Sequence, residues 1–310
     1  MSEPFDYDVI IIGGGCAGLT AGLYTARARL RTLLLDRLDV GGQLATTYDV
    51  ENYPGFPEPI LGPELMRRFA EQAKRFDCEI RNAQATAVRA DDPVVRVVQT
   101  DGGDLRCKAI IVASGADPKT LGAPGEDRLR GRGVSYCAIC DAPFFRNKDV
   151  AVIGGGNTAI DEGLYIAKLA RSLTVVHRRD QLRCEKIYEE RARKDPKFTF
   201  RWDTVVEEFL GGEVLEKLRL RNVKTDERSE LAAQGAFVLI GTKPNSEFLR
   251  GVCELDPLGF VVVNERKETS VPGIFAGGDV EDPVFRQAVT AAGFGCAAAL
   301  SAKHYIDRLG

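Results

Sequence analysis

The chain has 310 residues, of which 44% are hydrophobic and 28% are charged, so it can bury enough apolar surface for about two domains. The formal net charge of −3 provides no excess of basic groups for nucleic acid or for an anionic membrane. No apolar run approaches the ~20 residues that a spanning helix needs, and the acidic N-terminus lacks the parts of a signal peptide. We therefore expect a cytoplasmic protein that uses no nucleic acid and no membrane as a partner.

The first chemical signature is a short β-branched run that leads directly into a glycine turn. Residues 8–12 predict a buried parallel strand, and the Ala-rich residues 19–29 predict a helix whose N-terminus can hold a pyrophosphate. Between them, three glycines follow the G-x-G-x-x-G spacing: Gly13, Gly15 and Gly18. The next strand, 33–35, ends at Asp36, whose carboxylate can accept hydrogen bonds from ribose hydroxyls. This pattern predicts a nucleotide site, with a purely structural glycine turn as the alternative.

A second copy of this pattern begins at residue 150. A predicted strand over 150–153 leads into a glycine turn and a helix, whose residues expected to bind a nucleotide are Gly154, Gly156, Asn157 and Thr158. The following strand, 173–176, ends at His177, Arg178 and Arg179, at the place where the first copy has its acid. Arginines suit a 2′-phosphate, and Arg183 is close enough in sequence to join them. The second site is therefore predicted to prefer NADP(H) over NAD(H), and a solvated basic turn is the alternative.

The rest of the chain predicts how these two copies are arranged. Two apolar runs, 109–115 and 273–279, end in small residues and predict further strands. Residues 285–304 predict a long Ala-rich helix that is interrupted near Gly293 and Gly295. Since the second fingerprint lies between the two runs, we predict an α/β fold of two Rossmann-like dinucleotide-binding domains, one inserted into the other.

The predicted junctions lie near Asp117-Pro118 and within 242–245, because both segments carry turn residues. The split domain then comprises 1–117 and 245–310, and the inserted domain comprises 118–244. A linker in which the chain crosses twice would permit one domain to rotate against the other.

A single pair among the eight cysteines, Cys137 and Cys140, has the C-x-x-C spacing. A zinc site would need two more ligands, and the chain has no second C-x-x-C and only two histidines, so we predict no metal. The spacing instead predicts a dithiol that cycles through a disulfide. Asp141 lies next to the pair and can move a proton to or from the thiolates. Two unrelated buried cysteines remain the plainer alternative.

Taken together, these features resemble the low-molecular-weight thioredoxin reductases over essentially the whole chain. The resemblance includes five further motifs: Gly41-Gly42-Gln43-Leu44, Glu51-Asn52-Tyr53-Pro54-Gly55, Gly131-Arg132-Gly133-Val134-Ser135, His177-Arg178-Arg179-Asp180 and Arg286-Gln287-Ala288. It implies that the split domain binds FAD, that the inserted domain binds NADPH and carries the C-x-x-C pair, and that the protein is a homodimer.

The resemblance also implies roles for single residues toward FAD. Gly13, Gly15 and Asp36 would hold the adenosine half, while Gln43 and Asn52 would approach the ring system, with Gly42 also among the binding residues. Asp279 would reach the ribityl chain or the phosphates. The pyrimidine edge of the flavin would lie against Arg286, Gln287 and Ala288.

The reaction implied by the resemblance passes a hydride from NADPH to FAD and then two electrons to the Cys137–Cys140 disulfide. Cys140 would face the flavin, Cys137 would attack the disulfide of thioredoxin, and Asp141 would supply or accept the proton. Because the nicotinamide and the disulfide need the same face of the flavin, rotation of the inserted domain would alternate them.

Two other functions stay open at this point. The first is a disulfide oxidoreductase on the same scaffold with another donor or acceptor, such as a ferredoxin-linked, diflavin or peroxiredoxin-system reductase. The second is a flavin- or nucleotide-binding sensor without turnover, which leaves the C-x-x-C pair and Asp141 without a use. The sequence therefore favours an NADPH-dependent thioredoxin-disulfide reductase.

Overall fold

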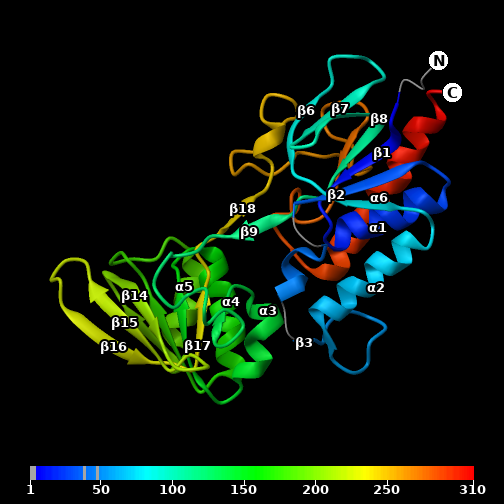
Figure 1. Cartoon of the computed structure of the whole chain (residues 1–310). Coiled ribbons are helices and arrows are strands. Elements are labelled where there is room, and N and C mark those ends of the chain that lie inside the picture. The colour runs from blue at the N-terminus through cyan, green and yellow to red at the C-terminus, as the bar shows by residue number, and fades with distance from the viewer. Residues whose placement is uncertain (1–4, 38–39, 47–48) are drawn as a thin grey trace. The chain divides into compact units, whose positions relative to one another are not determined.

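A computed structural model describes residues 5–37, 40–46 and 49–310 of the chain (Figure 1). The chain divides into two compact units, and unit 1 is made of residues 1–117 and 243–310 while unit 2 is made of 118–242. The chain crosses between them in β9 (Ala116–Pro118) and β18 (Thr242–Pro244), which pair with each other. The turn residues at these junctions thus lie in short strands, and the expected boundary at residue 244 falls at the end of β18.

Unit 1 is built on a mixed sheet with the strand order β5-β2-β1-β8-β7-β6, and β19 also pairs with β8. Strands β5, β2, β1, β8 and β19 run parallel, whereas β6, β7 and β8 form an antiparallel meander. The strands are β1 (Tyr7–Ile12), β2 (Thr32–Asp36), β5 (Glu79–Asn82), β6 (Ala85–Arg89), β7 (Arg96–Thr100), β8 (Gly103–Val112) and β19 (Ile274–Ala276). A separate antiparallel pair is formed by β3 (Asp49–Val50) and β4 (Ile60–Leu61). The strands predicted at 8–12, 33–35, 109–115 and 273–279 are confirmed in kind, with small differences at their ends.

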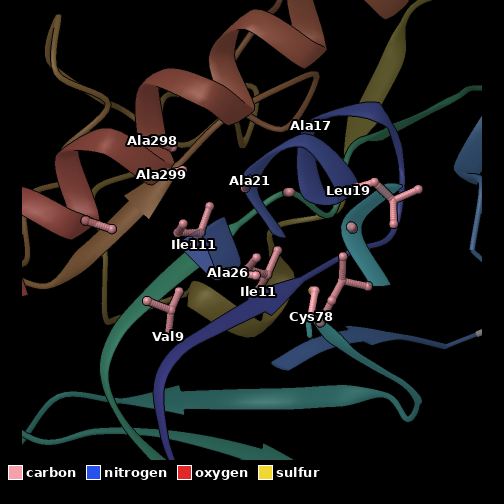
Figure 2. Packing of buried hydrophobic residues seen from close by; sticks show 14 of the residues in the cluster. Val9, Ile11, Ala17, Leu19, Ala21, Ala26, Cys78, Ile111, Ala298 and Ala299 are labelled. Carbon is pink, nitrogen blue, oxygen red and sulfur yellow. The ribbon is translucent and has the colours of Figure 1, made fainter. Parts of the chain in front are cut away.

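Three helices pack on one face of this sheet: α1 (Cys16–Arg27), α2 (Gly62–Lys74) and α6 (Ala288–Asp307). Figure 2 shows side chains of β1 and β8, such as Val9 and Ile111, packed with small residues of α1 and α6. Alternate residues, such as Ile10, point to the opposite face and form a second core beneath the loops of the C-terminal segment. Because both faces of the sheet are buried, β1 and β2 consist mostly of β-branched and leucine residues.

The last helix, α6, differs from its prediction. It begins at Ala288 and runs without interruption to Asp307, whereas the sequence predicted 285–304 with a break near Gly293 and Gly295. The reason is packing, because a Cβ on Gly295 would lie 2.0 Å from the carbonyl oxygen of Ala17. Gly295 therefore permits the close contact of α6 with α1, and this contact outweighs the cost of about 1 kcal/mol for a glycine within a helix.

Unit 2 is built on a parallel sheet with the order β10-β17-β11-β12-β13, next to an antiparallel sheet β14-β15-β16. The strands are β10 (Val134–Ser135), β11 (Asp149–Ile153), β12 (Ser172–Val176), β13 (Phe198–Arg201), β14 (Thr204–Leu210), β15 (Lys217–Asn222), β16 (Arg228–Ala232) and β17 (Gly235–Val238). The helices are α3 (Ala138–Asp141), α4 (Asn157–Leu169) and α5 (Lys186–Lys194). Helix α4 covers one face of the parallel sheet, and β14–β16 cover the other. The parallel strands and helices of both units confirm the prediction of an α/β fold with two Rossmann-like domains.

Short 3₁₀ segments occupy three of the connections: Gly42–Thr46, Ala142–Phe145 and Glu247–Leu249. No helix of the described residues is both long enough and apolar enough to cross a membrane.

Candidate active site

The first glycine turn connects β1 to α1 and leaves an open space in front of the helix N-terminus. Gly13 has a φ of 107°, and a Cβ there would lie 2.3 Å from the carbonyl oxygen of Ala113, so only glycine fits. At Gly15, by contrast, a Cβ would meet no atom within 4 Å. A phosphate group can therefore approach the backbone at Gly15, next to the free N–H groups of α1. The third glycine, Gly18, packs so closely that its Cβ would lie 1.8 Å from the oxygen of Gly13.

Asp36, at the end of β2, lies directly beside this turn. The N–H of Gly14 donates a hydrogen bond of 2.6 Å to Oδ2 of Asp36. This contact holds the carboxylate at the carboxyl end of the parallel strands, where dinucleotide folds place the ribose. Asp36 is thus fixed by the turn that it is predicted to serve.

Gly42, Gln43 and Asn52 come from the segment that follows β2 and lie in the same unit. A Cβ on Gly42 would lie 3.4 Å from Cα of Gly15, so the 3₁₀ segment packs against the glycine turn. The side-chain amide of Gln43 donates to the carbonyl of Ala116 at 2.5 Å. Asn52 Nδ2 donates to Oε1 of Gln287 at 3.3 Å, which ties the segment to the start of α6.

The C-terminal segment brings Asp279 to the same helix N-terminus. A Cβ on Gly278 would lie 2.8 Å from Cβ of Ala17, so the turn after β19 packs on the first turn of α1. Burial, together with the neighbouring Asp282, raises the pKa of Asp279 to about 6, although Arg286 partly opposes this. Asp279 is thus a carboxylate whose desolvation a hydrogen-bonding ligand would relieve.

Asp282 organises the residues that precede α6 and was missed by the sequence analysis. Its side chain is buried, and its two oxygens accept the N–H groups of Val284, Phe285 and Arg286 at 2.8–3.0 Å. This turn sets Arg286 in a left-handed conformation, with φ at 48°, and places Gln287 as the N-cap of α6. An Asp in a D-P-V sequence is a turn signal, so this residue could have been found.

The second glycine turn, between β11 and α4, repeats the first in unit 2. Gly154 has a φ of 148°, and a Cβ there would lie 2.4 Å from the oxygen of Leu239. A Cβ on Gly156 would meet no atom within 4 Å, so a phosphate could approach here too. The side chain of Asn157 is engaged with Glu185, since Nδ2 donates to Oε1 at 3.2 Å and Oδ1 accepts the N–H of Glu185 at 2.8 Å. Thr158 follows on the first turn of α4.

The residues of the basic turn after β12 that are predicted to bind a nucleotide differ in their exposure to solvent. Arg178, Arg179 and Arg183 are exposed, and the N–H of Arg183 donates to the oxygen of Gly155 at 2.7 Å, which brings this loop to the glycine turn. His177 is only 4% exposed, and its ring lies 2.5 Å from the position that a Cβ on Gly155 would occupy. Burial lowers the pKa of His177, and the nearby arginines lower it further, so its imidazole is neutral at pH 7. The structure therefore presents the guanidinium groups to solvent, while His177 packs beneath the turn.

The dithiol lies directly after β10, at the edge of the parallel sheet of unit 2. Cys137 and Cys140 are joined in a disulfide with a Cα–Cα distance of 5.4 Å. Cys137 is the N-cap of α3, and its sulfur accepts the N–H of Cys140 at 3.2 Å. Cys140 is exposed, as is Ile139 between the two cysteines, so the pair is accessible within its own unit. The alternative of two unrelated buried cysteines is wrong.

Asp141 is held near the disulfide by Ser135, which the sequence places in a motif of the resemblance without a role of its own. The hydroxyl of Ser135 lies 2.5 Å from Oδ2 of Asp141 and 3.3 Å from the carbonyl oxygen of Cys137, and it accepts the N–H of Cys137 at 3.1 Å. Burial raises the pKa of Asp141, and the hydrogen bond from Ser135 partly opposes this. Because a hydroxyl can both donate and accept, Ser135 can serve the charged and the neutral form of Asp141. A carboxyl with a raised pKa is suited to exchange a proton with a thiolate.

The remaining cysteines are thiols in the described part of the chain: Cys16, Cys78, Cys107, Cys184, Cys253 and Cys296. Burial raises the pKa of Cys16 to about 12, with Asp279 as a further cause, and this thiol contacts the sulfur of Met66 at 3.6 Å. It therefore acts as a small apolar side chain at the first glycine turn. Within the described residues, no group of three or more His, Cys, Asp or Glu side chains is arranged to hold a metal ion.

Known proteins share both the sequence and this structure. The family described as pyridine nucleotide-disulphide oxidoreductase matches residues 7–295. The chain is 47% identical to a thioredoxin reductase of Streptomyces coelicolor over 304 residues, which cover 97% of this chain and 94% of that protein. It is 45% identical to a thioredoxin reductase of Bacillus subtilis over 100% of this chain and 98% of that protein. The chain belongs to the thioredoxin reductase group of the pyridine nucleotide-disulphide oxidoreductase family.

A solved structure of this group supports the fold of each unit. The crystal structure of a thioredoxin reductase from Streptococcus pyogenes superimposes with a TM-score of 0.93 at 39% identity, covering 97% of this chain and 98% of that one. The prediction of a thioredoxin reductase-type flavin disulfide oxidoreductase is thereby confirmed. Membership in this family implies a flavin and a pyridine nucleotide as cofactors.

Within a pyridine nucleotide-disulphide oxidoreductase, the observed groups are suited to bind one dinucleotide in each unit and to exchange thiol for disulfide in unit 2. Unit 1 offers an open helix N-terminus between two carboxylates, Asp36 and Asp279, and unit 2 offers a second open helix N-terminus beside three guanidinium groups. Next to the accessible disulfide lies a carboxyl group, Asp141, that is suited to exchange a proton. The residues for each of these functions lie within a single unit.

Proposed function

We propose that this chain is an NADPH-dependent thioredoxin-disulfide reductase, in which electrons pass from NADPH through FAD and the Cys137–Cys140 disulfide to thioredoxin. The observation that carries the proposal is the accessible disulfide with the pKa-raised Asp141 beside it, on the same unit as a dinucleotide fold. A sensor without turnover would need neither group.

FAD is assigned to unit 1 because the residues there fit it. The open space at Gly15 accepts a pyrophosphate, and Asp36 accepts hydrogen bonds from the adenosine ribose. Asp279 would accept hydroxyl donors of the ribityl chain, which would offset the cost of its burial. The ring system would lie near the segment tied together by Gln43, Asn52 and Gln287, with Gly42, Arg286 and Ala288 beside it.

NADPH is assigned to unit 2. The pyrophosphate would lie at Gly156 and the N-terminus of α4, near Asn157 and Thr158, and Arg178, Arg179 and Arg183 would bind the 2′-phosphate. FAD, when bound, supplies hydride acceptance from NADPH and two-electron transfer to the disulfide.

The protein's own residues then complete the exchange. Reduction breaks the Cys137–Cys140 bond, and the two electrons are accompanied by protons, one of which Asp141 can donate. Cys137 as a thiolate attacks the disulfide of thioredoxin, which breaks that bond, forms a mixed disulfide and releases one thioredoxin sulfur as a thiolate that solvent protonates. Cys140 then attacks Cys137, which restores the internal disulfide and releases the reduced partner. Deprotonation of Cys140 for this step returns a proton to Asp141.

The relatives named above are thioredoxin reductases, and their names support thioredoxin as the acceptor. The resemblance also leads us to propose a homodimer, which light scattering would test through the molar mass. We place the enzyme in the cytoplasm because the chain has a single C-x-x-C pair among eight cysteines, a usage that suits a reducing compartment.

The proposal is tested by NADPH-dependent reduction of a purified thioredoxin. We expect the wild type to reduce thioredoxin and Cys137→Ser to lose this activity while it retains flavin. Cys184→Ser is the matched control, because this thiol lies in the same unit but outside the pair. Persistent reduction by Cys137→Ser would overturn the assignment of the nucleophile. A wild type that takes electrons from reduced ferredoxin but not from NADPH would point to the same scaffold with another donor.

A further inference from the structure

The basic turn after β12 is fastened to two segments that lie far from it in the sequence. The N–H of Thr204 donates to the oxygen of His177 at 2.9 Å, and the N–H of Asp203 donates to the oxygen of Arg179 at 3.2 Å. In turn, the N–H of Val223 donates to the oxygen of Asp203 at 2.6 Å. The hairpin between β15 and β16 is therefore held next to the turn by main-chain hydrogen bonds.

This hairpin directs one side chain, Lys224, toward the turn. Its Nζ lies 3.2 Å from Oδ2 of Asp180 and 3.0 Å from Oδ2 of Asp203. The two carboxylates raise the pKa of Lys224, and Lys224 lowers the pKa of Asp180, so both partners are charged at neutral pH. The pair of Lys224 with Asp180 is exposed, with 57% and 66% of the two side chains accessible, whereas 17% of the Asp203 side chain is accessible. An exposed pair contributes little to the stability of a fold, so a purely structural role predicts that its loss changes little.

The charges of the turn explain what Lys224 can do. Three guanidinium groups, on Arg178, Arg179 and Arg183, stand against the carboxylates of Asp180 and Asp203, which leaves a formal net charge of +1. Asp180 follows Arg179 directly and would repel a phosphate bound there. Lys224 raises the net charge of this cluster to +2 and pairs with both carboxylates.

We propose that Lys224 is a positioning residue that sets the preference of the second nucleotide site for a 2′-phosphate, by neutralising Asp180 and Asp203 beside the basic turn. The inference rests on the proposed preference of unit 2 for NADPH. Two parts of the chain would then select a 2′-phosphorylated nucleotide: the basic turn and the hairpin between β15 and β16. Only the basic turn follows the second glycine fingerprint directly in the sequence. Arg178, Arg179 and Arg183 bind the phosphate, and Lys224 prevents the adjacent acids from opposing them.

The test uses direct binding of two small probes to the purified holoprotein, measured by calorimetry: 2′,5′-ADP, which carries the 2′-phosphate, and 5′-AMP, which lacks it. We expect Lys224→Ala to weaken 2′,5′-ADP binding roughly three- to tenfold, because one unit charge is lost near a doubly charged group in a screened, exposed site. Binding of 5′-AMP should not change. Lys217→Ala is the matched control, since Lys217 forms a similar exposed pair with Glu230 at the other end of β15.

A second variant separates charge neutralisation from a structural effect. Asp180→Asn in the Lys224→Ala background removes one of the carboxylates that Lys224 neutralises, so we expect it to restore most of the lost 2′,5′-ADP affinity. The inference is overturned if Lys224→Ala behaves like Lys217→Ala, if both probes are weakened equally, or if Asp180→Asn gives no recovery. A wild type that binds both probes equally would instead contradict the proposed NADPH preference itself.

Discussion

The two glycine turns have the same backbone conformation, but the next strand ends in an acid, Asp36, in unit 1 and is followed by two arginines, Arg178 and Arg179, in unit 2. In both, the first glycine has a positive φ and is wedged against a neighbouring carbonyl, and the third residue of the turn faces open space. The middle glycine makes room for the residue that ends the following strand, since a Cβ on Gly14 would lie 2.7 Å from Asp36 and one on Gly155 would lie 2.5 Å from His177. We propose that this frame binds phosphate in both units, with the end of the second strand selecting the nucleotide.

The two units also differ in how the rest of the sheet is covered. In unit 1, α1, α2 and α6 share a core on one face, and the close contact of α6 with α1 depends on Gly295. In unit 2, the antiparallel strands β14–β16 cover the face opposite α4 and bring Asp203 and Lys224 to the basic turn. In our proposal, the covering elements of unit 2 therefore add to the selectivity of the basic turn, whereas those of unit 1 have no such role.

The largest effect should come from filling the open space at each turn. Gly15 and Gly156 have extended backbone conformations that any residue adopts, so Gly15→Val and Gly156→Val should fold. We expect Gly15→Val to purify without flavin, and Gly156→Val to retain flavin but to lose NADPH binding, because the new side chain occupies the phosphate position. Flavin absorbance and NADPH binding check the two outcomes. Full flavin content in Gly15→Val would show that the first turn does not hold the pyrophosphate.

Charge at the basic turn should have the next largest effect. Replacing Arg178 and Arg179 by alanine removes two charge-assisted hydrogen-bond donors, so the KM for NADPH should rise about 100-fold or more. The KM for NADH should stay similar, because NADH has no 2′-phosphate. Steady-state kinetics with both cofactors measure this, and equal losses for both would remove the 2′-phosphate assignment.

These assignments show what was predictable from the sequence. The strands, both glycine turns and the C-x-x-C pair are local patterns, so the fold class and the placement of Gly13, Asp36, Gly154 and Cys137 could be predicted. The start of α6 could not, because it depends on the turn around Asp282 and on packing against α1. The contact of Lys224 with Asp180 could not be predicted either, because no sequence pattern links the two residues and only the folded sheet β14–β16 brings them together.

A smaller effect is expected on the pH dependence of thioredoxin reduction by the Cys137–Cys140 pair, a feature that unit 1 lacks. The hydrogen bond from Ser135 lowers the pKa of Asp141, against the stronger effect of burial, so Ser135→Ala should raise that pKa further. A proton donor stays protonated to higher pH when its pKa rises, so the alkaline limb of thioredoxin reduction should move to higher pH. Asp141→Asn should abolish this limb. Stopped-flow rates across pH check both, and an unchanged profile in Ser135→Ala would exclude the proposed coupling.

The last effect concerns the stability of the flavin-free protein rather than catalysis. Asp279 has a pKa of about 6 in the folded state against 3.8 as its ordinary value, so the stability that its protonated form contributes is lost as pH rises from about 4 through 6. Asp279→Asn cannot ionise, and it should therefore be more stable than the wild type by up to about 3 kcal/mol at pH 7.5, with no such difference below pH ~4. Urea unfolding of the apoprotein at both pH values tests this. A gain that is equal at both would indicate packing rather than ionisation.

The central claim, that one fingerprint holds a flavin and the other delivers electrons to it from NADPH, is tested most directly by anaerobic titration of the purified yellow protein. We predict that NADPH bleaches the visible flavin absorbance rapidly, and that NADH at the same concentration does so far more slowly. A flavin that dithionite reduces but NADPH does not would contradict the account.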